Sequence, residues 1–254
     1  MDYSPELVVN AAGFAGRPNV DACESQKRET FKGNVVLPLN VAETCSLLEI
    51  PWAHISSGCM YNGPGPYRET DPSNFSFEHP PCSWYSGTKV MAERLVEGVG
   101  KGYLWRLRLP FDEWDSPRNY LTKLMNYPRL VNVTNSISHR LDFVKACLDL
   151  WRIRAPFGTY NMTNPGAVCT SDVVRAMARL GFKDSFQFFD SLEEFNQTIV
   201  APRTNCTLDT SKLSQAGVEM RPVWHALEES LRCWRWADQP RKSEVELATP
   251  GNPA

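Results

Sequence analysis

Short apolar runs that end in small or polar residues alternate with amphipathic segments through the first half of the chain. The runs are residues 7–13 (LVVNAAG), 53–58 (AHISSG) and 103–110 (YLWRLRLP), and helix candidates lie between them at about 21–49 and 83–98. Near-continuous apolar runs of this length are typical of parallel strands that are buried on both faces. Their alternation with helices predicts an α/β protein with a doubly wound parallel sheet.

The second half of the chain has shorter elements. Strand candidates at residues 129–133 and 158–162 alternate with amphipathic helix candidates at about 141–152, 171–181 and 224–236. We therefore expect a sheet domain in residues 1–110 and a smaller α/β lobe, residues 111–236, over the carboxyl edge of the sheet. Residues 61–81 are rich in proline and glycine and predict a loop. The polar residues 237–254 predict a disordered tail.

The composition excludes several classes of protein. The chain has 254 residues, 42% of them hydrophobic, and its 27 Lys and Arg nearly balance 29 Asp and Glu. Nucleic-acid binding would need a basic face, and no apolar run is long enough for a membrane helix. The start, MDYSPELVVN, lacks the features of a secretory signal, so we expect a cytoplasmic protein with eight free cysteines. The four histidines show no ligand spacing, and we expect no metal site.

The stretch YSGTK places Tyr85 and Lys89 four residues apart at the start of a helix candidate, so both side chains share one helix face. A free phenol has a pKa of about 10, and a nearby ammonium is expected to lower it toward the range of useful acid–base catalysis. Ser57 follows the preceding strand candidate. Together these residues could protonate a substrate carbonyl oxygen while hydride reaches its carbon. The spacing alone is weak, because a packed tyrosine beside a solvated lysine would look the same.

Several separated blocks resemble one known family. The order NAAG, SSGCMY and YSGTK is similar to extended short-chain dehydrogenases/reductases, members of the NAD-dependent epimerase/dehydratase family. The blocks GRPNVDACES, YSGTKVMAE, SPRNYLTKL, TNPGAV and IVAPRTNCTLD resemble the bifunctional nucleotide-sugar 3,5-epimerase/4-reductases of rhamnose biosynthesis. The resemblance spans about residues 7–235. It implies a Rossmann-type sheet, an oxidoreductase and isomerase activity on a 4-keto-6-deoxy sugar nucleotide, and NADP(H) or NAD(H) as cofactor.

The resemblance also implies roles for five side chains. Ser57, Tyr85 and Lys89 match the group that reduces the 4-keto function. Cys59 and Lys123 match the acid–base pair of epimerisation, which needs one group on each face of the sugar. The alternatives stay open: a free cysteine is most often a small buried hydrophobe, and Lys123 could be a solvated helix lysine.

Further residues of the cleft follow from the same resemblance. The expected cofactor contacts, besides Tyr85 and Lys89, are Ala11, Ala12, Gly13 and Asn34. The expected contacts to the nucleotide-diphosphate sugar are Arg17, Asn19, Arg118, Asn119, Asn164, Arg203 and Asn205. For Arg17, a surface salt bridge is an equally good interpretation. The sequence leaves open whether the nucleotide is UDP or dTDP and whether the chain forms a homodimer.

One part of the family pattern is missing. The family opens with a strand and a Gly-rich turn that holds the cofactor pyrophosphate, whereas residues 1–13 resemble its fourth strand. We therefore expect an N-terminally truncated Rossmann-type sheet with weakened cofactor binding. The chain could be a fragment or a natural short form. The alternative function is a non-catalytic or epimerase-only protein that binds a nucleotide sugar or a partner subunit.

Overall fold

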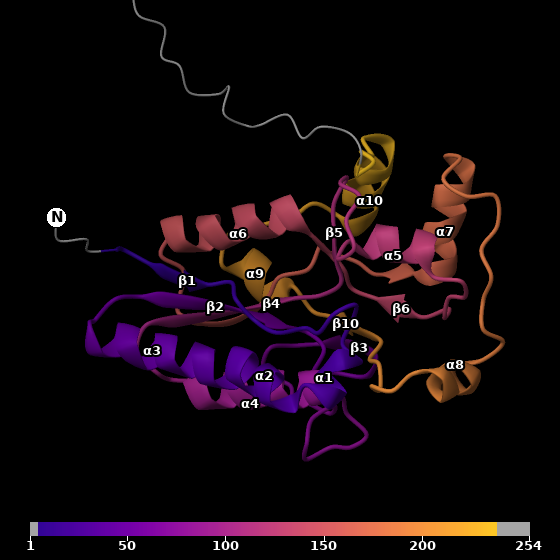
Figure 1. The fold of residues 1–254 in the computed structure, drawn as a ribbon. Helices are drawn as coiled ribbons and strands as arrows, with labels where there is room; N and C mark the ends of the chain where they lie inside the picture. Colours follow the sequence, from indigo (N-terminus) through magenta and orange to yellow (C-terminus); the bar gives the residue numbers. More distant parts are fainter. Residues whose placement is uncertain (1–4, 238–254) are drawn as a thin grey trace, which may run out of the picture.

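A four-stranded parallel sheet forms the centre of the computed structural model, which describes residues 5–237 (Figure 1). Its strands are β1 (Val8–Asn10), β2 (Trp52–Ser57), β4 (Gly102–Leu107) and β8 (Gly158–Asn161), in the order β1-β2-β4-β8. All pairs are parallel. The three strands expected in the first 110 residues are therefore confirmed, with ends shifted by one to three residues.

Two long helices cover one face of this sheet (Figure 1). They are α3 (Leu37–Leu47) and α4 (Trp84–Val96), which pack on the sheet through a cluster that includes Ala42, Trp52, Val96 and Leu104. The helical stretch expected at residues 21–49 is present but divided. Its parts before α3 are α1 (Ala22–Ser25), α2 (Lys27–Phe31) and a π-helical turn (Lys32–Val36). Pro38 follows that turn, and because it has no N–H to donate, regular α-helical hydrogen bonding is interrupted there.

The other face is covered by α6 (Arg140–Arg152) and α9 (Ser211–Gln215). The core on this side is built from aromatic and aliphatic side chains of the sheet and both helices, among them Tyr103, Trp105, Phe143, Leu150 and Leu213. The sequence pattern places residues 158–162 in the smaller lobe, whereas β8 joins the central sheet beside β4. Only the tertiary structure shows this, because a short buried strand carries no mark of the sheet to which it belongs.

A second layer of helices lies beyond the carboxyl ends of the strands and has its own core. Its helices are α5 (Tyr120–Asn126), α7 (Thr170–Arg179), α8 (Leu192–Thr198) and α10 (Val223–Arg232). Three two-stranded pairs connect it to the sheet: β5 (Pro110–Phe111) with β7 (Ser138–His139), β6 (Thr134–Asn135) with β9 (Val168–Cys169), and β3 (Gly63–Tyr67) with β10 (Cys206–Leu208). Figure 1 shows this lobe at the end of the sheet toward which β2 and β4 run.

Two expected elements differ from the structure. Residues 129–133 form no strand; Leu130 instead enters the lobe core and makes a single bridge to Phe188. The expected loop at 61–81 contains β3, which pairs with β10 even though it reads Gly-Pro-Gly-Pro-Tyr. None of the described helices has the length and apolar character needed to cross a bilayer. The expected tail at 237–254 lies, apart from its first residue, outside the described residues.

Candidate active site

The carboxyl end of β2 presents a serine and a cysteine to the space between the sheet and the lobe. The Gly58 amide donates to the Leu107 carbonyl at 3.0 Å, which keeps the chain against β4 as it leaves the strand. A Cβ at Gly58 would lie 2.6 Å from Leu208 Cδ1, so a larger residue there would have to displace the Leu208 side chain. The Cys59 amide then donates to the Ser57 hydroxyl at 3.2 Å. The turn therefore holds Ser57 and Cys59 side by side.

Helix α4 carries Tyr85 and Lys89 to the same edge of the sheet. The Ser83 hydroxyl caps this helix by accepting a hydrogen bond from the Ser86 amide at 3.1 Å. Lys89 is 5% exposed, and its ammonium donates to the Ile55 carbonyl at 3.4 Å. Burial lowers the pKa of Lys89 to about 8, while Glu93 and Cys59 act in the opposite direction. Lys89 is thus a buried cation with weak compensation.

The Tyr85 phenol behaves differently from the sequence expectation. Burial raises its pKa, the Cys59 thiol adds to this, and a hydrogen bond with Ser57 opposes it. The net effect is a raised pKa of the phenol, and the Lys89 ammonium donates to the Ile55 carbonyl. The prediction that the ammonium lowers the pKa of the phenol is therefore wrong for the chain alone. At neutral pH Tyr85 is a protonated phenol next to the Ser57 hydroxyl.

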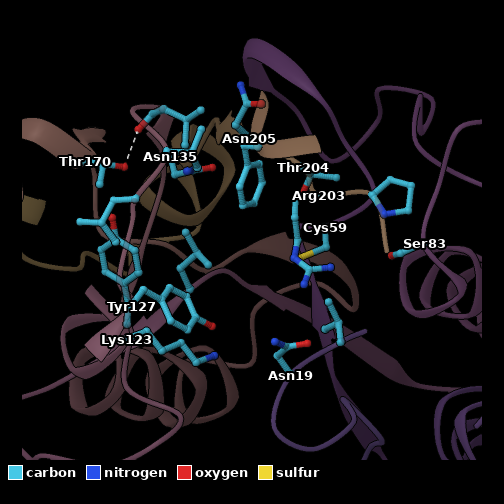
Figure 2. A pocket seen from close by; sticks show the side chains of 18 of the residues that line it. Asn19, Cys59, Ser83, Lys123, Tyr127, Asn135, Thr170, Arg203, Thr204 and Asn205 are labelled. Carbon is cyan, nitrogen blue, oxygen red and sulfur yellow. Dashed lines mark hydrogen bonds between the residues drawn. The ribbon is translucent and has the colours of Figure 1, made fainter. Parts of the chain in front are cut away.

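A cavity of about 310 Å³ opens beside these groups, between the sheet and the lobe (Figure 2). Ser57 and Lys89 are not among the residues that line it, although Ser57 contacts Tyr85 and the Cys59 amide. Seven of the residues expected to be catalytic or substrate-binding line the cavity: Asn19, Cys59, Tyr85, Arg118, Lys123, Arg203 and Asn205. They come from five separate stretches of the chain. The structure therefore brings the predicted site together from both halves of the sequence.

Four cationic side chains line the cavity, which is otherwise mostly apolar. Arg118, Lys123, Arg129 and Arg203 line it, and no Asp or Glu does. Arg129 forms an ion pair with Glu194 at 2.6 Å and Arg203 forms one with Asp21 at 2.8 Å, whereas Arg118 and Lys123 have no acidic partner within residues 5–237. Burial lowers the pKa of Lys123, and the charges of Arg118 and Arg203 lower it further. The two cations without an acidic partner, Arg118 and Lys123, favour an anionic ligand in this part of the cavity.

Other predicted contacts have partners within the chain. The Asn164 amide accepts from the His139 amide and donates to Asp142, and the Asn119 side chain caps α5. The Asn34 amide bonds both the N–H and the carbonyl of Phe14. None of these three asparagines lines the cavity. They fix the loops around it, and any ligand contact they make stays a prediction.

The remaining predicted contacts lie at the end of β1. Arg17 is exposed and does not line the cavity, although its neighbours Gly16 and Asn19 do. Ala11, Ala12 and Gly13 are exposed as well, and a Cβ at Gly13 would lie 3.5 Å from the Lys89 ammonium. The stretch from Ala11 to Gly13 therefore covers Lys89 closely, and its role in cofactor binding stays a prediction.

A buried arginine that was not among the predicted residues also belongs to the site. Arg108 follows β4 directly and is 1% exposed, yet one edge of its guanidinium contacts Cys59. Asn135 and Thr204, which also line the cavity, accept its other hydrogen bonds. A charged residue at the end of an otherwise apolar strand is the signal in YLWRLRLP that could have identified it.

Buried polar atoms without a hydrogen-bond partner lie near Lys89. They are Asn10 Nδ2 and both ring nitrogens of His54, on paired residues of β1 and β2. Burial, and then Lys89, lower the pKa of His54 to about 3, so the ring is neutral. Buried polar groups are normally satisfied by protein, water or ligand. Asn10 Nδ2, at the end of β1, together with Tyr85 and Lys89, fits the polar part of a nicotinamide cofactor at the carboxyl ends of the strands. No cluster of possible metal ligands occurs in the described part of the chain.

Comparisons with known proteins agree with this geometry. The family model described as RmlD substrate binding domain matches residues 1–234. The bifunctional dTDP-4-dehydrorhamnose 3,5-epimerase/dTDP-4-dehydrorhamnose reductase of Arabidopsis thaliana is 34% identical over 234 residues, covering 88% of this chain and 75% of the relative. A trifunctional UDP-glucose 4,6-dehydratase/UDP-4-keto-6-deoxy-D-glucose 3,5-epimerase/UDP-4-keto-L-rhamnose-reductase of the same plant is 33% identical, but this chain spans only 34% of its length.

Solved structures show the same fold. The crystal structure of the L780 UDP-rhamnose synthase from Acanthamoeba polyphaga mimivirus matches with a TM-score of 0.81 and 22% identity, over 90% of this chain and 82% of that one. A dTDP-4-dehydrorhamnose reductase from Bacillus anthracis, in complex with NADP, matches with a TM-score of 0.73 and 19% identity, over 90% and 79%. At these identities the likeness establishes the Rossmann-like architecture of the central sheet.

Proposed function

This chain belongs to the RmlD substrate-binding domain family, and from that premise we propose that it reduces the 4-keto group of a nucleotide-linked 4-keto-6-deoxy sugar after 3,5-epimerisation. The observation that carries the proposal is the contact of Ser57 with Tyr85 and with the Cys59 amide, since Tyr85 and Cys59 line a cavity that also has four cationic side chains. Hydroxyl and phenol donors suit a carbonyl oxygen, and the cations suit a diphosphate. The proposed cofactor is NADP(H) or NAD(H), since the Bacillus anthracis structure contains NADP.

In the reduction, Tyr85 acts as the acid. Its raised pKa keeps the phenol protonated, so it can donate its proton to the 4-keto oxygen as that oxygen becomes negative. The Ser57 hydroxyl, which already contacts the phenol, donates a hydrogen bond to the same oxygen and fixes its position. A bound NAD(P)H supplies the hydride. The same Ser57 hydroxyl, whose hydrogen bond opposes the rise in the pKa of the phenol, stabilises the phenolate that remains once the proton has left.

Epimerisation uses the other two polar side chains. The carbon atoms beside the 4-keto group carry acidic hydrogens, because the electron pair left by deprotonation moves onto the keto oxygen. Cys59 extends from the end of β2 and Lys123 from α5 of the lobe, so they reach the cavity from different sides (Figure 2). A thiolate at Cys59 removes the proton, and the Lys123 ammonium returns one on the other face. Net charge and proton number are unchanged after one exchange.

The rest of the cavity fits the nucleotide part of such a substrate. Arg118 and Arg203 line the cavity and are the proposed contacts of the diphosphate. Arg118 has no acidic partner among the described residues, and the ion pair with Asp21 holds Arg203 in place. Tyr127 and Phe195 line the apolar part of the cavity and offer ring faces to a nucleobase. The relatives named above act on UDP or dTDP sugars, and the nucleotide is therefore one variable of the test.

The experiment supplies the purified chain with UDP- or dTDP-4-keto-6-deoxyglucose and NADPH or NADH in deuterated water. We expect solvent deuterium at C3 and C5, followed by consumption of the reduced cofactor. Tyr85→Phe should lower the rate of reduction by about 10²- to 10⁴-fold and leave the labelling in place. Cys59→Ala should abolish labelling, whereas the matched variant Cys233→Ala, at an exposed thiol, should not.

Two results would contradict the proposal. Unchanged reduction by Tyr85→Phe would remove the phenol from the reaction. The absence of both labelling and cofactor consumption with every nucleotide and cofactor would remove the proposed function, and a binding role would then be tested by titrating the sugar nucleotide alone.

A further inference from the structure

Arg108 is a buried cation without an acidic partner. Arg108 follows the last residue of β4 in the chain and is 1% exposed. Nε and Nη2 donate to Asn135 Oδ1 at 3.2 and 2.6 Å, and Nη2 also donates to the Thr204 carbonyl at 2.7 Å. Nη1 donates to the Thr204 hydroxyl at 3.0 Å and to Cys59 Sγ at 3.5 Å. No Asp or Glu of residues 5–237 forms an ion pair with it.

The charge of this guanidinium is not compensated by these neutral acceptors. Taking a cation out of water costs several kcal/mol unless an opposite charge is close by. The nearby buried arginine Arg106, which lies within β4, follows this rule, because it pairs with Glu93 at 2.6 Å. Of the three residues that Arg108 contacts through its N–H groups, Cys59 alone can become an anion. Since Cys59 lines the cavity, the negative charge would form where substrate binds.

We propose that Arg108 is a positioning residue that serves as the counterion of a Cys59 thiolate and aims its sulfur into the cavity. The inference rests on the proposed epimerisation, in which this thiolate takes the proton from the sugar carbon. The C–H electron pair moves onto the keto oxygen, the sulfur becomes a thiol, and the Lys123 ammonium then returns a proton on the other face. Arg108 gains and loses no proton in this step.

Asn135 fixes the orientation of the guanidinium. Its Oδ1 accepts two hydrogen bonds from Arg108 and one from the Cys206 amide at 3.0 Å. These hydrogen bonds orient the guanidinium so that its Nη1 edge faces Cys59. An aspartate has nearly the same shape, so Asn135→Asp would keep the hydrogen bonds while giving Arg108 a permanent carboxylate partner. The cation would then no longer favour the thiolate.

Other charges also act on Cys59 and must stay constant in the test. They come from Tyr85 and Lys89 on α4, from Lys123 on α5 and from Cys206 on β10. Asn135→Asp, Arg108→Gln and Arg108→Lys leave all of these in place. Asn40→Asp adds the same negative charge at an exposed position of α3 and is the matched control.

The experiment follows the alkylation of Cys59 by iodoacetamide as a function of pH, with the modified peptide identified by mass. An opposite charge in contact moves a titration by about one pH unit or more. We therefore expect the midpoint of the Cys59 profile to rise by about one pH unit in Asn135→Asp and in Arg108→Gln. Arg108→Lys should restore much of the difference, and Asn40→Asp should match the unaltered chain. Circular dichroism checks that each variant is folded.

The same variants are then assayed for deuterium incorporation into the keto sugar. Labelling should fall about tenfold near neutral pH in Asn135→Asp and recover as the pH rises, because a shift of one pH unit is a factor of ten in thiolate. An unmoved alkylation profile in folded Asn135→Asp would overturn the inference. A shifted profile in a chain that never labels the sugar would leave Arg108 as the counterion of Cys59 and reject the proposed epimerisation.

Discussion

Lys89 offers a sharp test of the electrostatics of the site, because replacing it should stabilise the folded chain. Its ammonium is 5% exposed and has one long hydrogen bond to the Ile55 carbonyl. Burial lowers the pKa of Lys89 from 10.5 to about 8. At about 1.4 kcal/mol per pH unit, this difference corresponds to about 3 kcal/mol of lost stability. A methionine of similar length should fill the same space without that cost.

The pH dependence of the effect has a definite sign. Below a pH of about 8 the lysine is protonated in the folded and unfolded chain, so the full cost of burying the charge is present. Between pH values of about 8 and 10.5 the folded chain loses the proton first, and the cost disappears. The free energy of unfolding of Lys89→Met should therefore be about 3 kcal/mol higher than that of the unaltered chain near neutral pH. At a pH of about 10.5 the two values should be nearly equal.

Urea unfolding of both chains, followed by circular dichroism across this pH range, measures the difference directly. The matched control is Lys145→Met, at an exposed position of α6, which should change the free energy of unfolding by less than about 0.5 kcal/mol at every pH. If Lys89→Met is no more stable than the unaltered chain near neutral pH, or if its advantage does not shrink at alkaline pH, the ammonium is not the uncompensated cation described above. Activity in the keto-sugar assay should fall in Lys89→Met, because residues that an active site needs often reduce the stability of the fold.

Three further predictions concern the sheet that supports the site. Glu93→Gln should lower the free energy of unfolding by about 3–5 kcal/mol, because it leaves the Arg106 guanidinium buried without its partner carboxylate; a loss below about 1 kcal/mol in urea unfolding would contradict this. Gly102→Ala would place a Cβ 2.2 Å from the buried Trp52 ring and should cost about 1–3 kcal/mol by the same measurement. Burial lowers the pKa of His54 to about 3, so its ring should stay neutral in the folded chain as the pH falls from 6.5. The unfolded chain takes up a proton over that range, and the free energy of unfolding should therefore fall. Proton NMR should show no titration of this ring above a pH of about 4, and a midpoint near 6 would refute the prediction.

The strand and helix order of the first half followed from local patterns. The runs LVVNAAG, AHISSG and YLWRLRLP became β1, β2 and β4, because strands buried on both faces must be apolar over their length. The same reasoning placed Ser57, Tyr85 and Lys89 at one sheet edge, since the carboxyl ends of parallel strands meet there. The resemblance of separated blocks added Cys59, Lys123 and Arg203, which the cavity brings together. All of this depends on information that lies within one turn or one strand of the chain.

What needed the tertiary structure was the partner of each polar group. The strand β8 joined the sheet and Leu130 the lobe core because pairing over long sequence separations decides their place. The side-chain amides of three asparagines form hydrogen bonds with backbone and side-chain groups near the cavity, namely those of Asn34, Asn119 and Asn164. The residue type alone does not reveal these partners. The ionisation of Tyr85 and the position of Arg108 beside Cys59 depend on burial and on distances of a few ångströms. Sequence patterns report periodicity and residue chemistry, whereas desolvation and charge pairing exist only once distant segments are packed together.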